Sequence, residues 1–246
     1  MNCPRLRSKA VGWRDWAQPS RACPTYSTLI LAVPSPLNPS TSAVIAWSHG
    51  FGHIQVHAAH GYLLSLLVDH RISPDADWAL SRLSALAHRC RGEGIETSIR
   101  ISLRTGDRNF DAAGREDFHA AIAMLAFDFV DVSSGFYNID KQLIYPARPD
   151  MLTNRRTETV QLAEAFPRRR FILSGRALTA PTENLPENVH IGICSDLIAN
   201  PSYLAELGSG CINSGKCHYF SRRERHIACP RWPETSGEPL VRVPAD

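Results

Sequence analysis

Segments with the pattern of a β-strand alternate with segments with the pattern of a helix from about residue 43 onward. The predicted strands lie at residues 53–57, 95–103, 127–133, 170–173 and 189–193. The clearest predicted helices lie at residues 73–92, 116–125, 154–165 and 196–207. Regular strand-helix alternation is typical of a parallel sheet, because a parallel connection needs a crossover. The sequence therefore predicts an α/β fold.

The first of these strands has one apolar face and one polar face. Ile54 and Val56 point to one side, while Gln55 and His57 point to the other. In a β/α barrel the apolar side packs against outer helices, and chemistry gathers at the carboxyl ends of the strands. His57 stands at that end, so we expect the residues that follow it to belong to a site.

The run from His57 to Leu64, His-Ala-Ala-His-Gly-Tyr-Leu-Leu, resembles a known signature. It is similar to the fourth-strand motif of the old yellow enzyme family, FMN-dependent ene-reductases built on a TIM barrel, especially the branch related to 2,4-dienoyl-CoA reductase. The resemblance implies that His57 and His60 hold the carbonyl oxygen of a small α,β-unsaturated substrate. It implies that Tyr62 donates the proton and that NAD(P)H is the reductant.

Arg100 is expected to face the interior of the sheet, because it alternates with Ile99 and Ile101. A buried arginine needs an anionic partner or a ligand. The segment resembles the family strand whose arginine contacts the flavin ring, which implies that Arg100 binds FMN. The alternative is a structural ion pair with an inward acid such as Asp131.

Two later turns resemble the phosphate site for FMN. Leu173-Ser174-Gly175-Arg176 is similar to the glycine turn of the seventh family strand, which implies contact between Gly175 and the phosphate. In the segment 191–201, Cys194 and Ser195 stand where the family has Gly-Arg, and Asp196 adds a negative charge. We expect weaker phosphate binding at Cys194 and Ser195 because a guanidinium contact is missing.

The cysteine-containing tail, residues 209–246, resembles the segment that holds a 4Fe–4S cluster in the dienoyl-CoA reductase branch. Such clusters take four thiolates, and only Cys211, Cys217 and Cys229 are present here. We interpret the tail as a relic of that site or as ordinary reduced cysteines, and we do not expect a cluster. Zinc bound by these cysteines and His218 is an alternative without a standard spacing.

Simpler interpretations exist for two other features. His57 and His60 have a His-x-x-His spacing suited to a metal, but no carboxylate or cysteine lies close in sequence to complete a site. The segment 133–137, Ser-Ser-Gly-Phe-Tyr, either leaves room for a planar ligand or forms a tight turn. The spacing of the two histidines makes a metal-dependent lyase or hydrolase on a partial barrel a third functional interpretation.

Composition and charge argue against several classes of protein, namely nucleic-acid-binding, membrane-spanning and disulfide-rich proteins. The chain has 246 residues, 43% of them hydrophobic, and a formal charge of +3, which does not favour nucleic-acid binding. The longest apolar run, residues 29–33, is far shorter than a membrane span and is followed by prolines. Seven scattered cysteines, an odd number, indicate reduced thiols rather than a disulfide framework. We expect a protein without a membrane or nucleic-acid partner, located in the cytoplasm.

Three regions follow from these patterns. Residues 1–42 form a Pro-rich amino-terminal segment with one predicted strand at 26–33, residues 43–208 form a partial flavin-oxidoreductase barrel, and residues 209–246 form the tail. A full barrel has about eight strand-helix units, so we expect an amino-terminally truncated barrel. A second copy or a partner chain would complete it. The sequence thus predicts an FMN-dependent ene-reductase, or alternatively a non-catalytic barrel remnant that acts as a subunit or scaffold.

Overall fold

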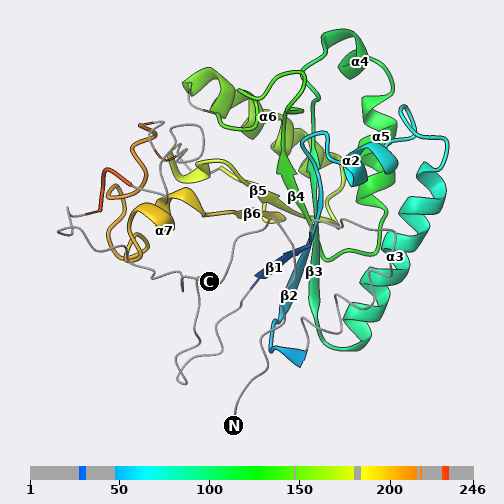
Figure 1. Ribbon diagram of the computed structural model, residues 1–246, viewed down its shortest axis with the longest axis horizontal. Helices are drawn as coiled ribbons and strands as arrows, with labels where there is room; N and C mark the ends of the chain where they lie inside the picture. The colour runs from blue at the N-terminus through cyan, green and yellow to red at the C-terminus, as the bar shows by residue number, and fades with distance from the viewer. Residues whose placement is uncertain are drawn as a thin grey trace, which may run out of the picture.

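A computed structural model gives the fold, and it describes residues 28–31, 48–146, 148–179, 184–214, 217 and 229–232. Its sheet has six strands in sequence order, and every neighbouring pair is parallel (Figure 1). The strands are β1 (Thr28–Leu31), β2 (His53–Ala58), β3 (Glu96–Ser102), β4 (Phe129–Ser133), β5 (Arg170–Leu173) and β6 (Val189–Ile191). The predicted parallel α/β fold is confirmed, and β5 has the predicted bounds.

Helices follow β2, β3, β4 and β6 in the chain. They are α2 (Leu63–Leu67), α3 (Ala76–Gly92), α4 (Arg108–Ala112), α5 (Arg115–Ala123), α6 (Pro149–Ala165) and α7 (Ser195–Ala199). A 3-10 helix, η1 (Ala177–Thr179), follows β5. The helix predicted at residues 196–207 is shorter than expected, because Asn200 precedes Pro201 and takes an extended conformation, with φ −145° and ψ 109°. Turns continue from there to residue 208.

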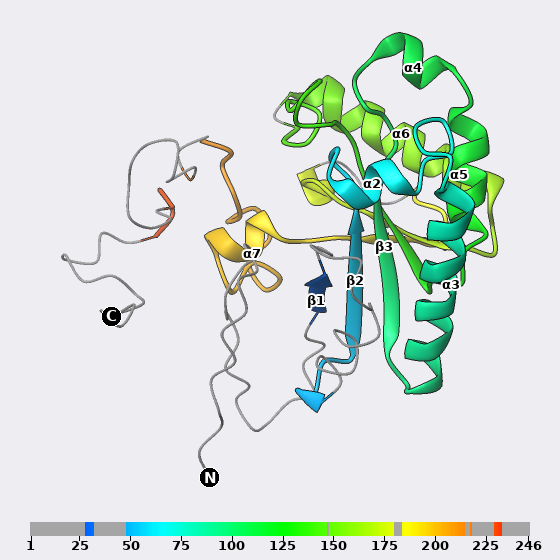
Figure 2. The same ribbon diagram turned by 45° about the vertical axis from the view of Figure 1, so that its right-hand side comes forward.

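The hydrophobic core lies between the sheet and the long helices. Figures 1 and 2 show α3 and α5 to the right of β2 and β3, and β1, the neighbouring strand of β2, to the left. The core comprises the helix-facing strand residues together with the apolar stripes of α3, α5 and α6; its members include Ile54, Val56, Ile99, Ile101, Val130, Val132, Phe171, Leu83, Leu86, Phe118, Ile122 and Leu162. Burial on this face explains the alternation of apolar residues along each strand.

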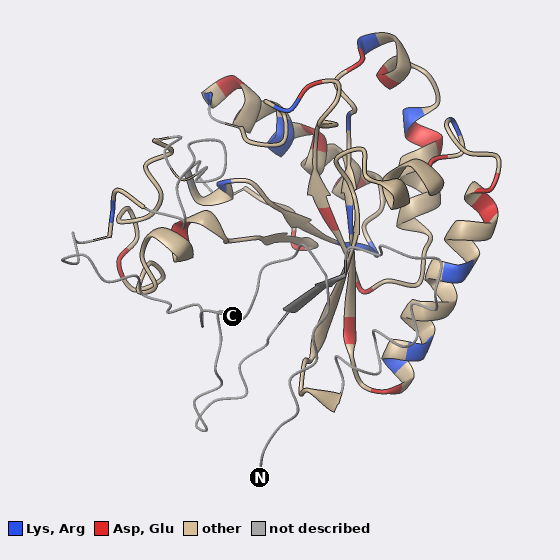
Figure 3. Cartoon of the chain, viewed as in Figure 1, with Lys and Arg blue, Asp and Glu red and all other residues tan. Residues whose placement is uncertain are grey.

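The opposite surface of the sheet, called here the inner face, carries polar residues. The register places His57 opposite Arg100, and Arg100 opposite Asp131. Charged side chains elsewhere lie mostly on the outer helices and the connecting loops (Figure 3). A second charged pair lies on the inner face near the amino-terminal ends of the strands, where Arg170 Nη1 is 3.5 Å from Glu96 Oε1. The pair of Arg100 and Asp131 lies nearer the carboxyl ends, where a site is expected.

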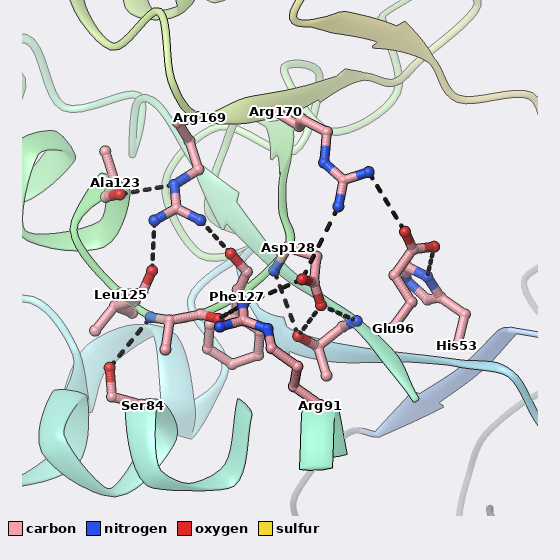
Figure 4. Close-up of polar contacts among 12 residues, drawn as sticks. His53, Ser84, Arg91, Glu96, Ala123, Leu125, Phe127, Asp128, Arg169 and Arg170 are labelled. Atoms are coloured by element: carbon pink, nitrogen blue, oxygen red, sulfur yellow. Dashed lines mark hydrogen bonds and ion pairs between the residues drawn. The ribbon is translucent and has the colours of Figure 1, made fainter. Parts of the chain in front are cut away.

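An arginine at the amino-terminal edge of the sheet holds the α5-to-β4 connection in place. Arg169 donates to the carbonyl oxygens of Ala123 at 2.8 Å, of Leu125 at 2.6 Å, and of Phe127 (Figure 4). Nearby, the Asp128 carboxylate accepts hydrogen bonds from the backbone N–H and the hydroxyl of Thr97 at 2.8 and 2.9 Å. These contacts satisfy backbone groups that end a helix and begin a strand, which is a stabilising role.

Candidate functional site

Two histidines and a tyrosine meet at the carboxyl end of β2. His60 and Gly61 both have positive φ, 68° and 79°, and this left-handed turn folds His60 back toward the strand. The ring centroids of His57 and His60 are 5.1 Å apart, and those of His57 and Tyr62 are 5.5 Å apart. The backbone N–H of His60 donates to Ser102 Oγ at 2.9 Å, which ties the turn to β3. The structure thus brings the three predicted catalytic residues together.

Both imidazoles are neutral at physiological pH. Burial, together with the charge of Arg100, lowers the pKa of His60 to about 3. Burial and Arg100 also lower the pKa of His57. His60 Nε2 lies 2.7 Å from Ser133 Oγ, and Arg100 Nη2 donates to that hydroxyl at 3.5 Å. A neutral imidazole offers one N–H donor and one acceptor nitrogen, so each ring is able to donate to a ligand oxygen.

Tyr62 belongs to a small group of tyrosines at the rim of the site. Its ring centroid lies 5.5 Å from that of Tyr137, whose hydroxyl lies 2.5 Å from the hydroxyl of Tyr145. Burial and the hydrogen bond with Tyr137 raise the pKa of Tyr62. The phenol therefore stays protonated at neutral pH, and because Tyr62 is 52% exposed, its ring is open to solvent.

Only part of this tyrosine group was predicted from the sequence. Tyr137 ends the segment 133–137, which predicted either a ligand space or a turn, and the backbone N–H of Tyr137 donates to the carbonyl oxygen of His60 at 3.1 Å. Tyr145 lies in a loop without any pattern that would have selected it. A loop residue of this kind is found only once the chain is folded.

Arg100 lies on the inner face, as expected, and pairs with Asp131. Arg100 Nη1 donates to Asp131 Oδ2 at 3.1 Å. The same carboxylate accepts from Gln55 Nε2 at 2.8 Å and from Ser174 Oγ at 2.6 Å. The ion pair considered as the structural alternative is therefore present. Arg100 Nε is nevertheless buried and has no hydrogen-bond partner among the described atoms, so this guanidinium retains a donor for a ligand.

Gly175 lies in a strained turn directly after β5. Its φ of +86° suits glycine, and a Cβ at this position would overlap Arg155 Nη1. The turn borders a small hollow, whose lining includes Arg155, Arg156, Ser174, Gly175 and Arg176. We call this space the Arg155 hollow. Sequence reasoning did not select Arg155, because the helical pattern of α6 gave no reason to place an arginine on its buried side.

The other two residues expected at the phosphate lie apart from the Arg155 hollow. Cys194 is the residue before α7 and Ser195 is its first residue; both are exposed, and neither lines the hollow. Asp196 is buried, and its Oδ1 accepts a hydrogen bond from the backbone N–H of Cys211 at 2.9 Å. The carboxylate is thus engaged with the tail.

The cysteines of the tail show no ligand set in the part of the chain that is described. Cys211, Cys217 and Cys229 are free thiols. Among the described residues, no group of three or more His, Cys, Asp or Glu side chains is arranged to hold a metal ion. His218, which belongs to the zinc alternative, lies outside the described residues, so that alternative stays a prediction.

The fold and this cluster define a parallel α/β protein with two neutral imidazoles, a phenol and an ion pair at one end of the sheet. A comparison with models of known protein families finds no match, and a comparison with curated proteins finds no significant relative. Within the described residues, no helix is long and apolar enough to cross a membrane.

Proposed function

We propose that this chain is an FMN-dependent NAD(P)H oxidoreductase of the ene-reductase type, which reduces an activated C=C bond. The observation that carries the proposal is the meeting of His57, His60 and Tyr62 at the carboxyl end of β2. Two neutral N–H donors and one protonated phenol are the groups that reduction of an α,β-unsaturated carbonyl requires. The resemblance of residues 57–64 to the old yellow enzyme signature supports the same assignment.

The two imidazoles bind the substrate carbonyl. Ser133 Oγ lies 2.7 Å from His60 Nε2 and accepts from Arg100 Nη2 at 3.5 Å. In the tautomer that we propose, the hydroxyl donates to Nε2 and His60 carries its proton on Nδ1. That N–H and an N–H of His57 donate to the carbonyl oxygen and stabilise the negative charge that develops on it as the enolate forms. Because both rings are neutral, they act as hydrogen-bond donors and leave protonation of the carbon to another group.

Tyr62 is the general acid. Its raised pKa keeps the proton on the phenol at neutral pH, and its exposure at the rim lets it reach the α-carbon of a substrate whose oxygen is held by the histidines. Tyr137 contacts the Tyr62 ring and orients it. The order of events within the chain is therefore polarisation of the carbonyl followed by proton transfer from Tyr62.

One donor without a partner and one glycine turn fit the phosphate-bearing cofactor that this reaction needs. Arg100 Nε is buried on the inner face, where the resemblance places the flavin ring, and it has no hydrogen-bond partner among the described atoms. Gly175 lines the Arg155 hollow. Arg100 and Gly175 would hold FMN, with Cys194 and Ser195 on the neighbouring turn. Bound FMN, reduced by NAD(P)H, would supply the hydride to the β-carbon.

The architecture we propose is a partial TIM barrel. All six strands are parallel, the helices of the core pack on one face, and β1 and β6 lie at the two edges of the sheet. A closed barrel has no edges, so another segment, a second copy or a partner chain would complete the site. The alternative function, a non-catalytic subunit or scaffold, is favoured by Cys194 and Ser195, which carry no positive charge where the phosphate is expected.

The visible absorption spectrum of the purified protein with added FMN tests the proposal. A flavin spectrum that shifts on binding and bleaches with NADH or NADPH is expected, followed by turnover of an enone. A folded protein that leaves the FMN spectrum unshifted would contradict the enzyme and favour the scaffold.

A further inference from the structure

Three tyrosine side chains extend the ring contacts of the histidine pair. The ring centroid of Tyr62 lies 5.5 Å from that of His57 and 5.5 Å from that of Tyr137. The ring centroids of Tyr137 and Tyr145 are 6.3 Å apart. These three residues are called here the tyrosine group. An aromatic surface therefore begins beside the residues proposed to hold the substrate carbonyl and continues away from them.

The tyrosine group offers its rings to a ligand. Tyr62, Tyr137 and Tyr145 are 52%, 39% and 48% exposed. Their hydroxyl groups bond to one another, Tyr137 to Tyr145 at 2.5 Å and Tyr62 to Tyr137. Leu63 and Ile139, which lie next to or near Tyr62 and Tyr137 in the chain, are also exposed. Exposed apolar side chains that gather in one place mark a binding surface more often than single ones do.

The surroundings of the tyrosine group suit an uncharged ligand. Burial and a hydrogen bond with a neighbouring phenol raise the pKa of Tyr62 and the pKa of Tyr137. Neither Asp140 nor Lys141, the only charged residues of the loop 134–146, is among the main causes of these pKa changes. A charged group of a ligand would lose water here without gaining a counter-charge, which is costly.

The loop 134–146 is held in place before any ligand arrives. The backbone N–H of Tyr137 donates to the carbonyl oxygen of His60 at 3.1 Å. The neighbouring Phe136 packs tightly on Gly61, where an added Cβ would approach the phenylalanine ring to 3.1 Å. A surface that is already ordered requires little further loss of conformational entropy on binding.

The rings are oriented for contact with another flat ring. The planes of Tyr62 and Tyr137 meet at 55°, and those of Tyr137 and Tyr145 meet at 62°. A ring stacked on one of these faces would present its edge to the next tyrosine. Offset stacking and edge-to-face contact are the two favoured geometries of aromatic pairs.

We propose that the tyrosine group binds an aromatic ring of the substrate, and that the substrate is therefore an uncharged enone whose double bond is conjugated to an aromatic ring. The histidines hold the carbonyl oxygen, and the aromatic ring lies against Tyr137 and Tyr145. The carbonyl end of this assignment rests on the proposed function, whereas the ring site rests on the contacts described here.

The test compares three ketones that share one enone and differ only in the group on the β-carbon. Benzylideneacetone carries a phenyl group, and its two analogues carry a cyclohexyl or a methyl group. Calorimetry measures their affinity for the full-length protein with oxidised FMN and without a reductant, so that no ketone is consumed. The wild-type protein is expected to bind the phenyl ketone about fivefold more tightly than the cyclohexyl ketone, which is similar in size but not flat.

Substitutions locate the ring site. Tyr137→Leu removes the aromatic ring and is expected to abolish the preference for the phenyl ketone, whereas Tyr137→Phe keeps the ring and should keep the preference. The matched control is Trp78→Leu, which removes an exposed aromatic side chain on α3, outside the tyrosine group. Equal affinity of the wild-type protein for the phenyl and cyclohexyl ketones, including no binding of either, would overturn the proposal. A preference that folded Tyr137→Leu retains would also overturn it.

A second measurement needs no variant and covers the case in which Tyr137→Leu does not fold. Isotope-filtered NMR of the wild-type protein with the phenyl ketone is expected to show nuclear Overhauser effects between tyrosine ring protons and the phenyl protons of the ligand. Contacts of the phenyl protons with aliphatic side chains alone would contradict the ring site.

Turnover with FMN and NADPH separates this inference from the proposed function. If the protein prefers the phenyl ketone in binding but reduces none of the three ketones, the ring site stands and the ene-reductase fails. If it reduces the phenyl and cyclohexyl ketones with equal KM, the ene-reductase stands and the ring site fails. A lower KM for the phenyl ketone that Tyr137→Leu abolishes would support both.

Discussion

Arg100 and Asp131 occupy directly paired positions on β3 and β4, and their side chains form an ion pair of 3.1 Å on the inner face of the sheet. Asp131 also accepts from Gln55 on β2 and from Ser174 just after β5. One carboxylate therefore connects four neighbouring strands below the histidine cluster. The ion pair between Arg100 and Asp131 stabilises the sheet whether or not Arg100 also contacts a cofactor.

Replacement of Asp131 by asparagine is expected to destabilise the protein by about 3 kcal/mol, since it leaves the Arg100 guanidinium partly buried without its counter-charge. The free energy of unfolding from urea titration measures the effect. Asp150→Asn, which removes an exposed ion pair with Arg148, is the control and should leave the unfolding midpoint unchanged. Equal midpoints for both variants and the wild-type protein would show that Asp131 does not hold the strands together.

Arg169 is expected to contribute strongly to stability through its three backbone acceptors. Arg169→Met removes hydrogen bonds to the carbonyl oxygens of Ala123, Leu125 and Phe127, and at about 1 kcal/mol each the loss is about 3 kcal/mol. Thermal and urea unfolding measure it. The matched control is Arg168→Met, at the exposed neighbouring position. A loss of the same size in both variants would assign the effect to charge rather than to these contacts.

His60 is expected to make the protein less stable as the pH falls below 6.5. Its pKa is about 3 in the folded protein, whereas an unfolded histidine titrates near 6.5. Between these values the unfolded state binds the additional proton, so the free energy of unfolding decreases by up to about 1.4 kcal/mol per pH unit. Above pH 6.5 neither state is protonated and this dependence disappears.

The measurement is urea unfolding at several pH values between 4 and 8 for the wild-type protein and His60→Gln. The variant should show a shallower slope below pH 6.5. It should keep the part that comes from His119, whose pKa burial lowers to about 4. An imidazole NMR titration that places the pKa of His60 near 6.5 would contradict the prediction.

Tyr62→Phe is expected to reduce the rate of alkene reduction by about 100-fold or more, because it removes the general acid. Reoxidation of the reduced flavin by oxygen should be unaffected, because it does not use this proton. Tyr137→Phe, which keeps the ring beside Tyr62 but removes its hydrogen bond, should have a smaller effect. Stopped-flow measurement of both half-reactions separates these outcomes, and an unchanged alkene rate in Tyr62→Phe would remove its assigned role.

Much of the fold could be predicted from the local spacing of apolar residues in the sequence. The period of two along residues 53–57 separated Ile54 and Val56, which pack in the core, from Gln55 on the inner face. The expected strand at residues 26–33 contains β1, although its ends lie outside the described residues. The helix predicted at 196–207 was too long, because the apolar spacing after Asn200 did not reveal that Pro201 would end it. Sequence patterns indicate which face of a helix or strand is buried more reliably than they indicate the residue at which the element ends.

The candidate site could be predicted from the sequence only where its residues lie close together in the chain. His57, His60 and Tyr62 lie close together in the sequence, at and just after the end of β2, so their motif predicted that they would lie together. The pairing of Asp131 with Arg100 was one of two readings, since parity places both on one face without showing which atoms meet. Ser174, just after β5, and Gln55 on β2 reach the same carboxylate although they are 43 and 76 residues away in the sequence. Strand register brings them together.

The sequence by itself determined the parallel α/β class, the inward direction of Arg100 and the local histidine-tyrosine motif, because each depends on the spacing of neighbouring residues. Only the tertiary structure decided that Arg155 lies buried against Gly175, that Tyr137 contacts Tyr62, and that Tyr145 contacts Tyr137. Those contacts join segments that local pattern does not relate, and packing of α6 and the loops against the strand ends brings them together.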